Sequence, residues 1–584
     1  MNSFQNHLTD VTNVLVIGCG GAGLRAAIEV KSQNLSVKVL GKRSKYDAHT
    51  VLAAGGINAS FGNLDSEDSW LHHFADTYQE GYGIGDPELI EIMAKNSLEA
   101  VSEIDRWGAN LEKLDNGKFN QRFFGAHSFR RTCFSGDYTG YSILQALLKK
   151  ANSLKIPIFD CEYVSSLLVK ENNCFGAMSI NTISGERTIH LADSIILCTG
   201  GHTKIWKRSS SRKQENTGDG LYLSLKAGCQ LIDMEMVQFH PTGMLFPEEM
   251  AGTLVTEAVR GEGGKLINSD GKRFMQDYDP ERMELSTRDQ VAIANYKEII
   301  EGRGTKNGGV FLDISHKNKE FIISKIPKIY RQFIESQMLD ISKKPMEVAP
   351  TAHYSMGGIK VNSKDHSTNI RGLFAAGEVA GGLHGANRLG GNSLAEILVF
   401  GKIVGKYASE YSKNLKFIER SNNSIKEAHE EIDSLIKKGS ELVVCLQADL
   451  SETMWKHCGV IKDEQNLNQG LRKLNDLENL SYSLEVNIGD NNMVDLINTL
   501  NFKASIITAK TTIKSAIERK ETLGAHNRSD YPLKKIYSNY NLLSNFSNGE
   551  INITKISTNE LKHELNFFLK NRLKASESSN KFLE

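Results

Sequence analysis

The sequence has no net charge, few cysteines and no regular cysteine spacing. Its 70 basic residues are balanced by 70 acidic ones, which argues against nucleic acid or an anionic membrane surface as the main partner. The 8 cysteines include no C-x-x-C pair, so we expect no iron–sulfur centre, no structural zinc and no other metal site. Free thiols are typical of a reducing, cytoplasmic compartment.

Long apolar segments are missing as well. No run of about eighteen apolar residues occurs, and a helix that crosses a bilayer needs that length. The polar segment before Val14 has no basic region, no Arg-rich amphipathic stretch and no twin-arginine pair, so we expect no export or organelle signal. The chain is therefore predicted to have no direct membrane span.

The chain is long and rich in glycine turns. With 584 residues it exceeds what one hydrophobic core usually supports, so about two to four domains are expected. Residues 14–40 read as the strand "VLVIG", the turn and helix "CGGAGLRAAIEVKSQ", and the strand "SVKVL". This order predicts a βαβ unit of the Rossmann type.

Later segments extend this organisation. "ADSIILCTGG" at 192–201 and "RGLFAAGEVAGG" at 371–382 again put an apolar strand directly before a glycine-rich turn, which predicts one nucleotide-binding domain built from separated segments. The more charged stretch between them contains a helical "TRDQVAIANYKEII" and a strand-like "GVFLDIS", and suits an inserted capping domain. Further on, "SIKEAHEEIDSLIKKGSELVVCLQ" has helical spacing, which predicts a helical domain.

The first glycine turn, "GCGGAG", fits G-x-G-x-x-G at Gly18, Gly20 and Gly23, with Gly21 as a further glycine. Without side chains, the backbone can approach a pyrophosphate at the helix N-terminus. An acidic residue about twenty positions later would bind the ribose hydroxyls of NAD, but the second strand ends in "VLGKR", with Gly41 in that place. A standard NAD site is therefore not predicted.

A series of motifs then occurs in a fixed order. They are "GCGGAG", "AHTVLAAGGINA", "NTGDG", "QFHPTG", "TEAVRGEGG", "ELSTRDQ", "PTAHYSMGG", "GEVAGGLHGANRLGGNSL" and "ERKETLGAHNR". In this order the sequence resembles the flavoprotein subunits of succinate dehydrogenase and fumarate reductase, over about residues 12 to 532.

The resemblance implies an α/β fold. A Rossmann-like FAD-binding domain would carry an inserted α+β capping domain and be followed by a helical domain and a small C-terminal region. The expected boundaries are 1–244 and 351–410 for the FAD-binding domain, 245–350 for the capping domain, 411–530 for the helical domain and 531–584 for the C-terminal region.

The resemblance also implies a covalently bound FAD. In the family, the histidine of an H-T-V segment is bonded to the flavin 8α-methyl group, and His49 with Thr50 matches that segment. Gly55 and Gly56 would let backbone amides lie against the flavin ring. The other implied FAD contacts are Lys42, Asp219, Glu378, Ser393 and Leu394. For the carboxylates of Asp219 and Glu378, the alternative role is to cap a turn.

A substrate with two carboxylates needs hydrogen-bond donors or cations at both ends of a dry pocket. The resemblance implies His240 and Thr256 at one end, and His353 and Arg388 at the other. The alternative is that these side chains satisfy buried backbone carbonyls.

Removing hydrogen from succinate needs a hydride acceptor on one face and a proton acceptor on the opposite side. The resemblance assigns the proton to Arg288, with Glu257 and Arg260 relaying it to solvent from positions i and i+3 of one helical turn. Because a guanidinium pKa exceeds about 12, this transfer has to be concerted with delivery to Glu257, or run as proton donation to fumarate. The alternative for Arg288 is a salt link at a helix start.

Electrons then have to leave through another chain. The resemblance implies an iron–sulfur subunit docked on a quinone-reactive membrane anchor. The chain would then be cytoplasmic and peripheral, held at the cytoplasmic face of the inner membrane by these partner subunits. One site serves both succinate oxidation and fumarate reduction, so the direction depends on the partners' potentials.

Two other functions remain open. L-aspartate oxidase, a relative, binds FAD without the covalent histidine and holds the substrate ammonium with the acidic residue of E-G-G-H-S, where this chain has Phe124. A flavin-binding subunit that has lost catalysis is the second alternative, since Thr522 and Leu523 depart from the family's E-S-R-G-A-H. The complete set of predicted catalytic residues favours the succinate and fumarate reaction.

Overall fold

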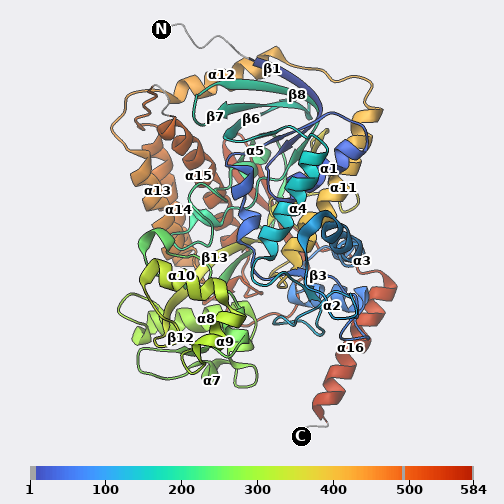
Figure 1. The fold of residues 1–584 in the computed structure, drawn as a ribbon. Coiled ribbons are helices and arrows are strands. Elements are labelled where there is room, and N and C mark those ends of the chain that lie inside the picture. Colours follow the sequence, from blue (N-terminus) through green and yellow to red (C-terminus); the bar gives the residue numbers. More distant parts are fainter. Residues whose placement is uncertain (1–7, 490–492, 582–584) are drawn as a thin grey trace.

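A mixed sheet lies in the upper part of the molecule in Figure 1, whose computed structural model describes residues 8–489 and 493–581. Its strand order is β5-β2-β1-β8-β7-β6, and β15 also pairs with β8. The pairs β5–β2, β2–β1, β1–β8 and β8–β15 are parallel. The pairs β8–β7 and β7–β6 are antiparallel. The bounds are β1 Leu8–Ile17, β2 Val37–Leu40, β5 Ile158–Phe159, β6 Glu162–Lys170, β7 Asn173–Asn181, β8 Arg187–Leu197 and β15 Leu373–Ala375.

Both faces of this sheet are covered. Val14 and Val16 of β1 belong to one hydrophobic core, together with helices α1, α3, α4 and α11, and the intervening Leu15 and Ile17 belong to a second core. Successive strand residues point to opposite faces, so an apolar run of this kind suits a strand buried on both sides. The helices of the first core are α1 Gly21–Ser32, α3 Pro87–Ile104, α4 Thr139–Ser153 and α11 Asn392–Asn414, and α2 Trp70–Glu80 packs against α3.

The predicted βαβ unit is confirmed, because β1 and β2 pair in parallel with α1 between them. Its turn needs glycine for two reasons. Gly18 has φ +118°, and a Cβ there would lie 2.0 Å from the carbonyl oxygen of Cys198. A Cβ on Gly23 would lie 1.9 Å from the carbonyl oxygen of Gly18, so this glycine lets the helix pack closely against the strand.

An antiparallel sheet of order β10-β13-β12-β11 lies with helices α7 to α10 at the lower left of the molecule in Figure 1. The predicted helix and strand of this part are confirmed as α8 Arg288–Glu298 and β12 Val310–Asp313. The sheet also includes β10 and β13, which flank the predicted capping segment. The other elements are β10 Val237–Met244, β11 Lys265–Ile267, β13 Met346–Ser355, α6 Ala258–Gly261, α7 Met275–Tyr278, α9 Lys319–Lys325 and α10 Pro327–Gln337.

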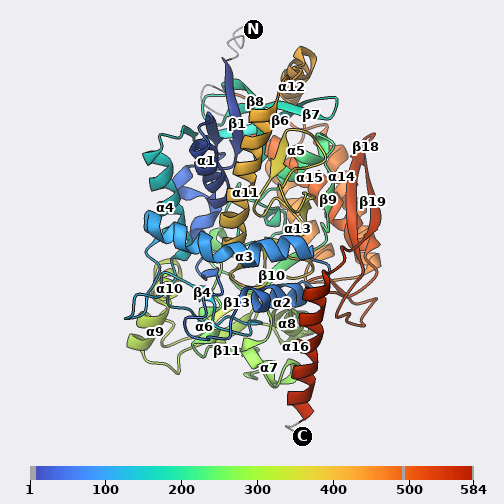
Figure 2. The ribbon, with the colours of Figure 1, turned by 90° about the vertical axis from the view of Figure 1, so that its right-hand side faces the viewer.

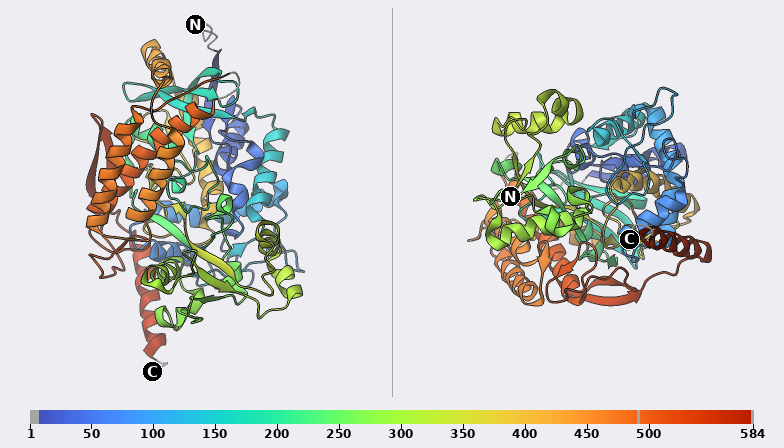
Figure 3. Two further views of the ribbon diagram at one scale, coloured as in Figure 1. Left: turned by 90° about the vertical axis from the view of Figure 1, so that its left-hand side faces the viewer. Right: turned by 90° about the horizontal axis from the view of Figure 1, so that it is seen from below.

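Helices α12 to α15 follow in the chain, and most of this segment lies beside the main sheet (Figure 3). The segment that was predicted to be helical forms two of them, α12 Asn422–Leu435 and α13 Val443–His457, because the chain leaves the helical path at residues 436–442. The other two are α14 Glu464–Ser481 and α15 Val494–Glu518. A short strand pair follows these helices, β16 Ile461–Lys462 with β17 Asn527–Arg528, and another lies in the N-terminal part of the chain, β3 Ile57–Asn58 with β4 Thr132–Cys133.

The C-terminal region adds a hairpin and a helix. The hairpin of β18 and β19 joins β9 and β14 in a four-stranded sheet. Helix α16 packs against α2 through Phe568 and His72 and projects beyond the body of the molecule (Figure 2). Within the described ranges, no helix combines the length and apolar character of a membrane-spanning segment. The bounds are β9 Leu231–Ile232, β14 Gly358–Ile359, β18 Tyr540–Ser547, β19 Glu550–Ser557 and α16 His563–Lys581.

Candidate active site

One long cavity extends from the first glycine turn to a group of histidines and arginines on β10, β13, α8 and the loop before α11. Of the predicted site residues, Gly23 and Arg260 are not part of its lining: Gly23 lies behind the turn, and Arg260 lies behind Glu257. The predicted residues that do line it are Gly18, Gly20, Gly21, Lys42, His49, Thr50, Gly55, Gly56, Asp219, His240, Thr256, Glu257, Arg288, His353, Glu378, Arg388, Ser393 and Leu394.

The glycine end of the cavity suits a pyrophosphate. Helix α1 has no side-chain cap, and Thr50 Oγ1 accepts the backbone N–H of Gly21 at 3.0 Å. The remaining amides of the first turn are left to bind an anion. Gly56 has φ +138°, and a Cβ there would lie 2.6 Å from the carbonyl oxygen of Cys133. These residues therefore fit the cofactor that the sequence predicts.

Gly41 is explained by a neighbour that the sequence reasoning did not name. A Cβ on Gly41 would lie 2.6 Å from Cys19 Sγ and 3.0 Å from the carbonyl oxygen of Arg43. The Cys19 side chain fills this space, and burial raises the pKa of its thiol to about 12. Cys19 and Gly41 therefore form one packing unit beneath the cavity.

Lys42, Asp219 and Glu378 lie around the same part of the cavity. Lys42 Nζ donates to Asn501 Oδ1 at 2.7 Å and lies 3.3 Å from Asp219 Oδ2. Burial lowers the pKa of Lys42, against the charge of Asp219. Glu378 Oε1 accepts the backbone N–H of Ser355 at 3.0 Å, and burial raises the pKa of this carboxyl group.

Two arginines meet at the other end. Arg288 Nε donates to Glu257 Oε2 at 2.9 Å, and Arg388 Nη1 donates to Ser393 Oγ at 3.0 Å. Gln238 joins them, since its Oε1 accepts Arg388 Nη2 at 3.0 Å and Arg288 Nη1 at 3.5 Å. Gln238 lies two residues before His240 on β10, and the sequence reasoning did not name it.

The two histidines face each other with ring centroids 5.4 Å apart. His240 Nδ1 accepts the backbone N–H of Thr242 at 3.3 Å, so a neutral imidazole has its proton on Nε2. Ser210 Oγ lies 2.9 Å from His353 Nδ1. Burial and the nearby arginines lower the pKa of both histidines well below the usual range. Both are therefore neutral hydrogen-bonding groups near pH 7.

Glu257 is a partly buried carboxylate that stays ionised. Burial opposes its charge, but Arg288 and Arg260 lower the pKa of Glu257 to about 2. Arg260 Nη2 lies 3.9 Å from Glu257 Oε2. Burial and the charge of Arg288 lower the pKa of Arg388 to about 10. With Arg288, Arg260 and Arg388 against Glu257, this end of the cavity is positively charged.

Further residues complete the cavity. Phe124 lines it, and its ring atom Cζ would lie 3.1 Å from a Cβ on Gly55, so an apolar ring is present where L-aspartate oxidase would have a carboxylate. Glu215 lies 3.1 Å from His49 Nδ1. Its position next to the "NTGDG" motif is the only signal in the sequence that could have indicated it.

The two departures in the C-terminal motif belong to the packed interior. Thr522 Oγ1 donates to the carbonyl oxygen of Tyr531 at 2.7 Å and accepts the backbone N–H of Arg528 at 2.9 Å. Leu523 is fully buried in a small cluster with Met236 and Tyr354. These residues stabilise the loop that supports the cavity wall.

Comparisons with known proteins identify the family of the chain. The family model described as FAD binding domain matches residues 13–394, and the one described as Fumarate reductase flavoprotein C-term matches residues 447–567. The chain is 42% identical to a subunit of the fumarate reductase (CoM/CoB) of Methanothermobacter marburgensis, over 89% of this chain and 94% of that protein. It is 35% identical to the succinate dehydrogenase flavoprotein subunit of Rickettsia conorii, over 91% and 92% of the two chains.

A solved structure agrees over almost the whole length. Mycobacterium smegmatis Sdh1 in complex with UQ1 has a TM-score of 0.87 and 36% identity, with 95% of each chain covered. The fold and the cavity define an FAD-dependent oxidoreductase. The chain belongs to the family of succinate dehydrogenase and fumarate reductase flavoprotein subunits, as its motifs predicted.

Proposed function

We propose that this chain interconverts succinate and fumarate at the arginine end of the cavity, with Arg288 as the proton-transferring residue. One observation supports this most strongly: His240, His353, Arg288 and Arg388 come from separate elements and line one cavity, whose other end is the glycine turn of a nucleotide-binding fold. A dianion balances the excess positive charge of this group.

The substrate carboxylates are bound at both ends. His240 and Thr256 hold one, and His353 and Arg388 hold the other. Because the pKa of His240 lies well below its usual range, its Nε2–H donates without gaining charge near neutral pH. L-aspartate suits the site less well, since its ammonium group would meet these cations and the ring of Phe124 instead of a carboxylate.

FAD is held along the rest of the cavity. Gly18, Gly20, Gly21 and the amides of α1 would bind the pyrophosphate, Gly55 and Gly56 would leave room for the flavin ring, and His49 would be the point of covalent attachment. The further contacts are Thr50, Lys42, Asp219, Glu378, Ser393 and Leu394. When bound, FAD supplies the group that accepts hydride from succinate or donates it to fumarate.

The proton is moved by the chain itself. Arg288 faces the cavity and donates to Glu257 at 2.9 Å, so a proton taken from the substrate by Arg288 passes to Glu257 in the same step. Arg260 lies behind Glu257 and leads away from the cavity. For fumarate reduction the proton moves in the opposite direction, from Glu257 through Arg288 to the substrate. Arg288 stays a guanidinium between turnovers.

An iron–sulfur subunit exchanges the electrons with this chain, and a quinone-reactive anchor attaches the complex to the cytoplasmic face of the inner membrane.

A second candidate for the electron donor follows from the comparisons. The relative whose name specifies CoM/CoB is more similar, at 42% identity, than the succinate dehydrogenase flavoprotein of Rickettsia conorii, at 35%. Electrons from donors of the CoM/CoB type, instead of quinol, would suit that relationship.

The decisive experiment is a set of three assays on the purified chain. We expect dye reduction with succinate, fumarate reduction by a reduced dye, and no oxidation of L-aspartate. Activity with L-aspartate alone would overturn the proposal. Assays of the assembled complex with menaquinol, and with coenzymes M and B, separate the two electron donors. Acid precipitation followed by peptide fluorescence tests the attachment of FAD to His49.

A further inference from the structure

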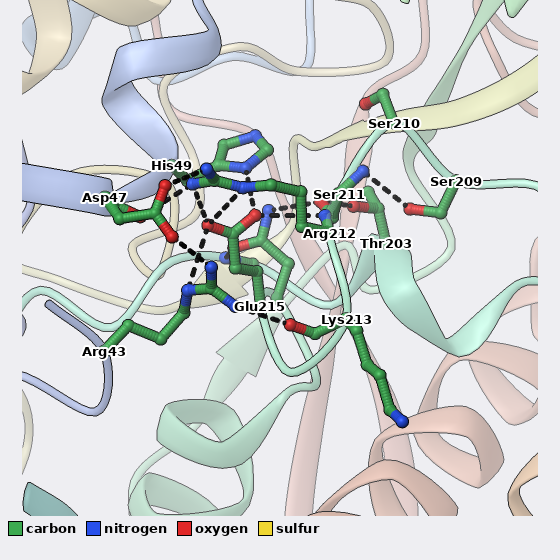
Figure 4. Close-up of polar contacts among 12 residues, drawn as sticks. Arg43, Asp47, His49, Thr203, Ser209, Ser210, Ser211, Arg212, Lys213 and Glu215 are labelled. Carbon is green, nitrogen blue, oxygen red and sulfur yellow. Dashed lines mark hydrogen bonds and ion pairs between the residues drawn. The ribbon is translucent and has the colours of Figure 1, made fainter. Parts of the chain in front are cut away.

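A buried carboxylate is held against the outer side of His49 (Figure 4). Glu215 Oε2 lies 3.1 Å from His49 Nδ1, and the Glu215 side chain is 5% exposed. Arg212 fixes this carboxylate, since its backbone N–H donates to Oε2 at 3.0 Å and its Nε donates to Oε1 at 3.1 Å. Arg43 Nε lies 3.7 Å away on another side. The carboxylate therefore has little freedom to turn away from the imidazole.

A second, outer carboxylate completes the group. Asp47 forms ion pairs with both Arg212 and Arg43 (Figure 4) but has no contact with His49 among the interactions of the described residues. Burial disfavours a charged imidazole, but the hydrogen bond and charge of Glu215 outweigh it and raise the pKa of His49. The same contacts hold the pKa of Glu215 well below its usual range.

We propose that Glu215 is the positioning residue for the attachment of FAD to His49. Its carboxylate keeps a proton on Nδ1, so that the Nε2 lone pair is the one presented to the cavity. It also stabilises the positive charge that the imidazole carries once Nε2 is bonded. This inference rests on the proposed covalent attachment at His49.

The bond-forming step conserves atoms and electrons. A bond forms between His49 Nε2 and the carbon of the flavin 8-methyl group, and one C–H bond of that methyl group breaks. Its electron pair reduces the flavin ring, which also takes up the proton and becomes an anion, while the imidazole keeps its Nδ1 proton and becomes a cation. Fumarate is the oxidant: it accepts a hydride from the ring and a proton, and leaves as succinate.

The buried charge is the reason why Glu215 matters. An imidazolium that a bound cofactor shields from water is unfavourable unless an opposite charge contacts it. A carboxylate beside a catalytic histidine acts in this way when it orients the ring and stabilises the imidazolium that forms. A glutamine side chain at this position would keep the shape of the contact and remove the charge.

The test compares Glu215→Gln with Asp47→Asn, which removes a carboxylate from the same group without touching the imidazole. Each full-length protein is incubated with FAD and fumarate, and the flavin that stays on the denatured chain is followed by in-gel fluorescence. We expect attachment to be about a hundredfold slower in Glu215→Gln and to change less than about threefold in Asp47→Asn, whose ion pairs are half-exposed. His49→Ala gives the baseline.

Three results would count against the proposal. Equal attachment rates in Glu215→Gln and the wild type would overturn the role of Glu215 and leave the succinate and fumarate reaction intact. No attachment in the wild type would overturn both this role and the covalent cofactor. If Glu215→Gln does not fold, NMR of the flavin-linked peptide from the wild type identifies the nitrogen of His49 that carries the flavin. Linkage through Nε2 supports the proposal, and linkage through Nδ1 contradicts it.

Discussion

Glu215 and Glu257 are carboxylates in two regions of the same cavity, Glu215 buried and Glu257 partly buried, and each contacts a basic side chain. Glu215 lies 3.1 Å from an imidazole, and Glu257 lies 2.9 Å from a guanidinium. Both carboxyl groups have a lowered pKa, but their partners differ as acids. An imidazole next to a fixed carboxylate becomes a stable cation, whereas a guanidinium that takes part in a proton relay has to return to its charged form. The same pairing therefore suits a fixed charge in one region and proton transfer in the other.

The largest effect is expected for Arg288→Ala, because it removes the proton carrier itself. Turnover with succinate should fall about a thousandfold or more, while the spectrum of the bound flavin stays unchanged. Steady-state dye reduction measures the loss, and Arg130→Ala, which removes an exposed arginine paired with Asp65, serves as the control. Substantial remaining turnover in Arg288→Ala would move the proton role to another residue.

Glu257→Gln should lower turnover about a hundredfold, since it keeps the hydrogen-bonding shape but removes the proton acceptor. The pH dependence sharpens this test. With its pKa lowered to about 2, Glu257 stays ionised above roughly pH 4, and its protonation becomes important only as the pH falls toward 2. Between about pH 5 and 8, the profile of turnover against pH should therefore have the same shape in the wild type and in Glu257→Gln.

Gly41→Ala tests the packing under the cofactor end. The new Cβ would lie 2.6 Å from Cys19 Sγ, and overpacking of this kind costs about 1–3 kcal/mol. Cys19→Ala removes the sulfur and should recover at least half of that loss in the double variant. Denaturant unfolding of the two single variants and the double variant measures the coupling. Strictly additive effects would show that Cys19 does not require glycine at position 41.

The smallest effect is expected at a third carboxylate, Glu80, which lines a small cavity with Arg288 and Glu257. Burial and the charge of Asp289 raise the pKa of Glu80 to about 8, although Asn387 donates to it at 2.7 Å. A raised pKa contributes stability at low pH, and this contribution is lost as the pH rises through about 8. Glu80→Gln should therefore stabilise the protein by about 1 kcal/mol at pH 8.5 and have little effect at pH 5.

Thermal unfolding at both pH values measures that difference, with Glu99→Gln on the exposed side of α3 as the control. An equal effect of Glu80→Gln at pH 5 and pH 8.5 would contradict the raised pKa. Loss of stability at pH 8.5 would mean that the ionised Glu80 is favourable there, paired with Arg288.

Much of the fold could be predicted from the sequence because its signals are local. The strand, glycine turn and helix predicted for residues 14–40, the helix at Arg288 and the strand at Val310–Asp313 are each formed by neighbouring residues, although β1 begins earlier than predicted, at Leu8. The division of one predicted helical stretch into α12 and α13 was missed, because helical spacing continues through a segment that tertiary packing bends. Family motifs, and not spacing, indicated the residues that line the cavity.

The sequence by itself determined the backbone requirements and the types of chemistry: glycines where a side chain cannot fit, and histidines and arginines in recognisable motifs. Only the tertiary structure decided which groups face each other. His49 and Glu215 are 166 residues apart, and Gln238 and Arg388 are 150 apart. No periodicity links such positions. Their protonation depends on burial and on charges brought close by folding, because Coulomb interactions act through space and not along the chain.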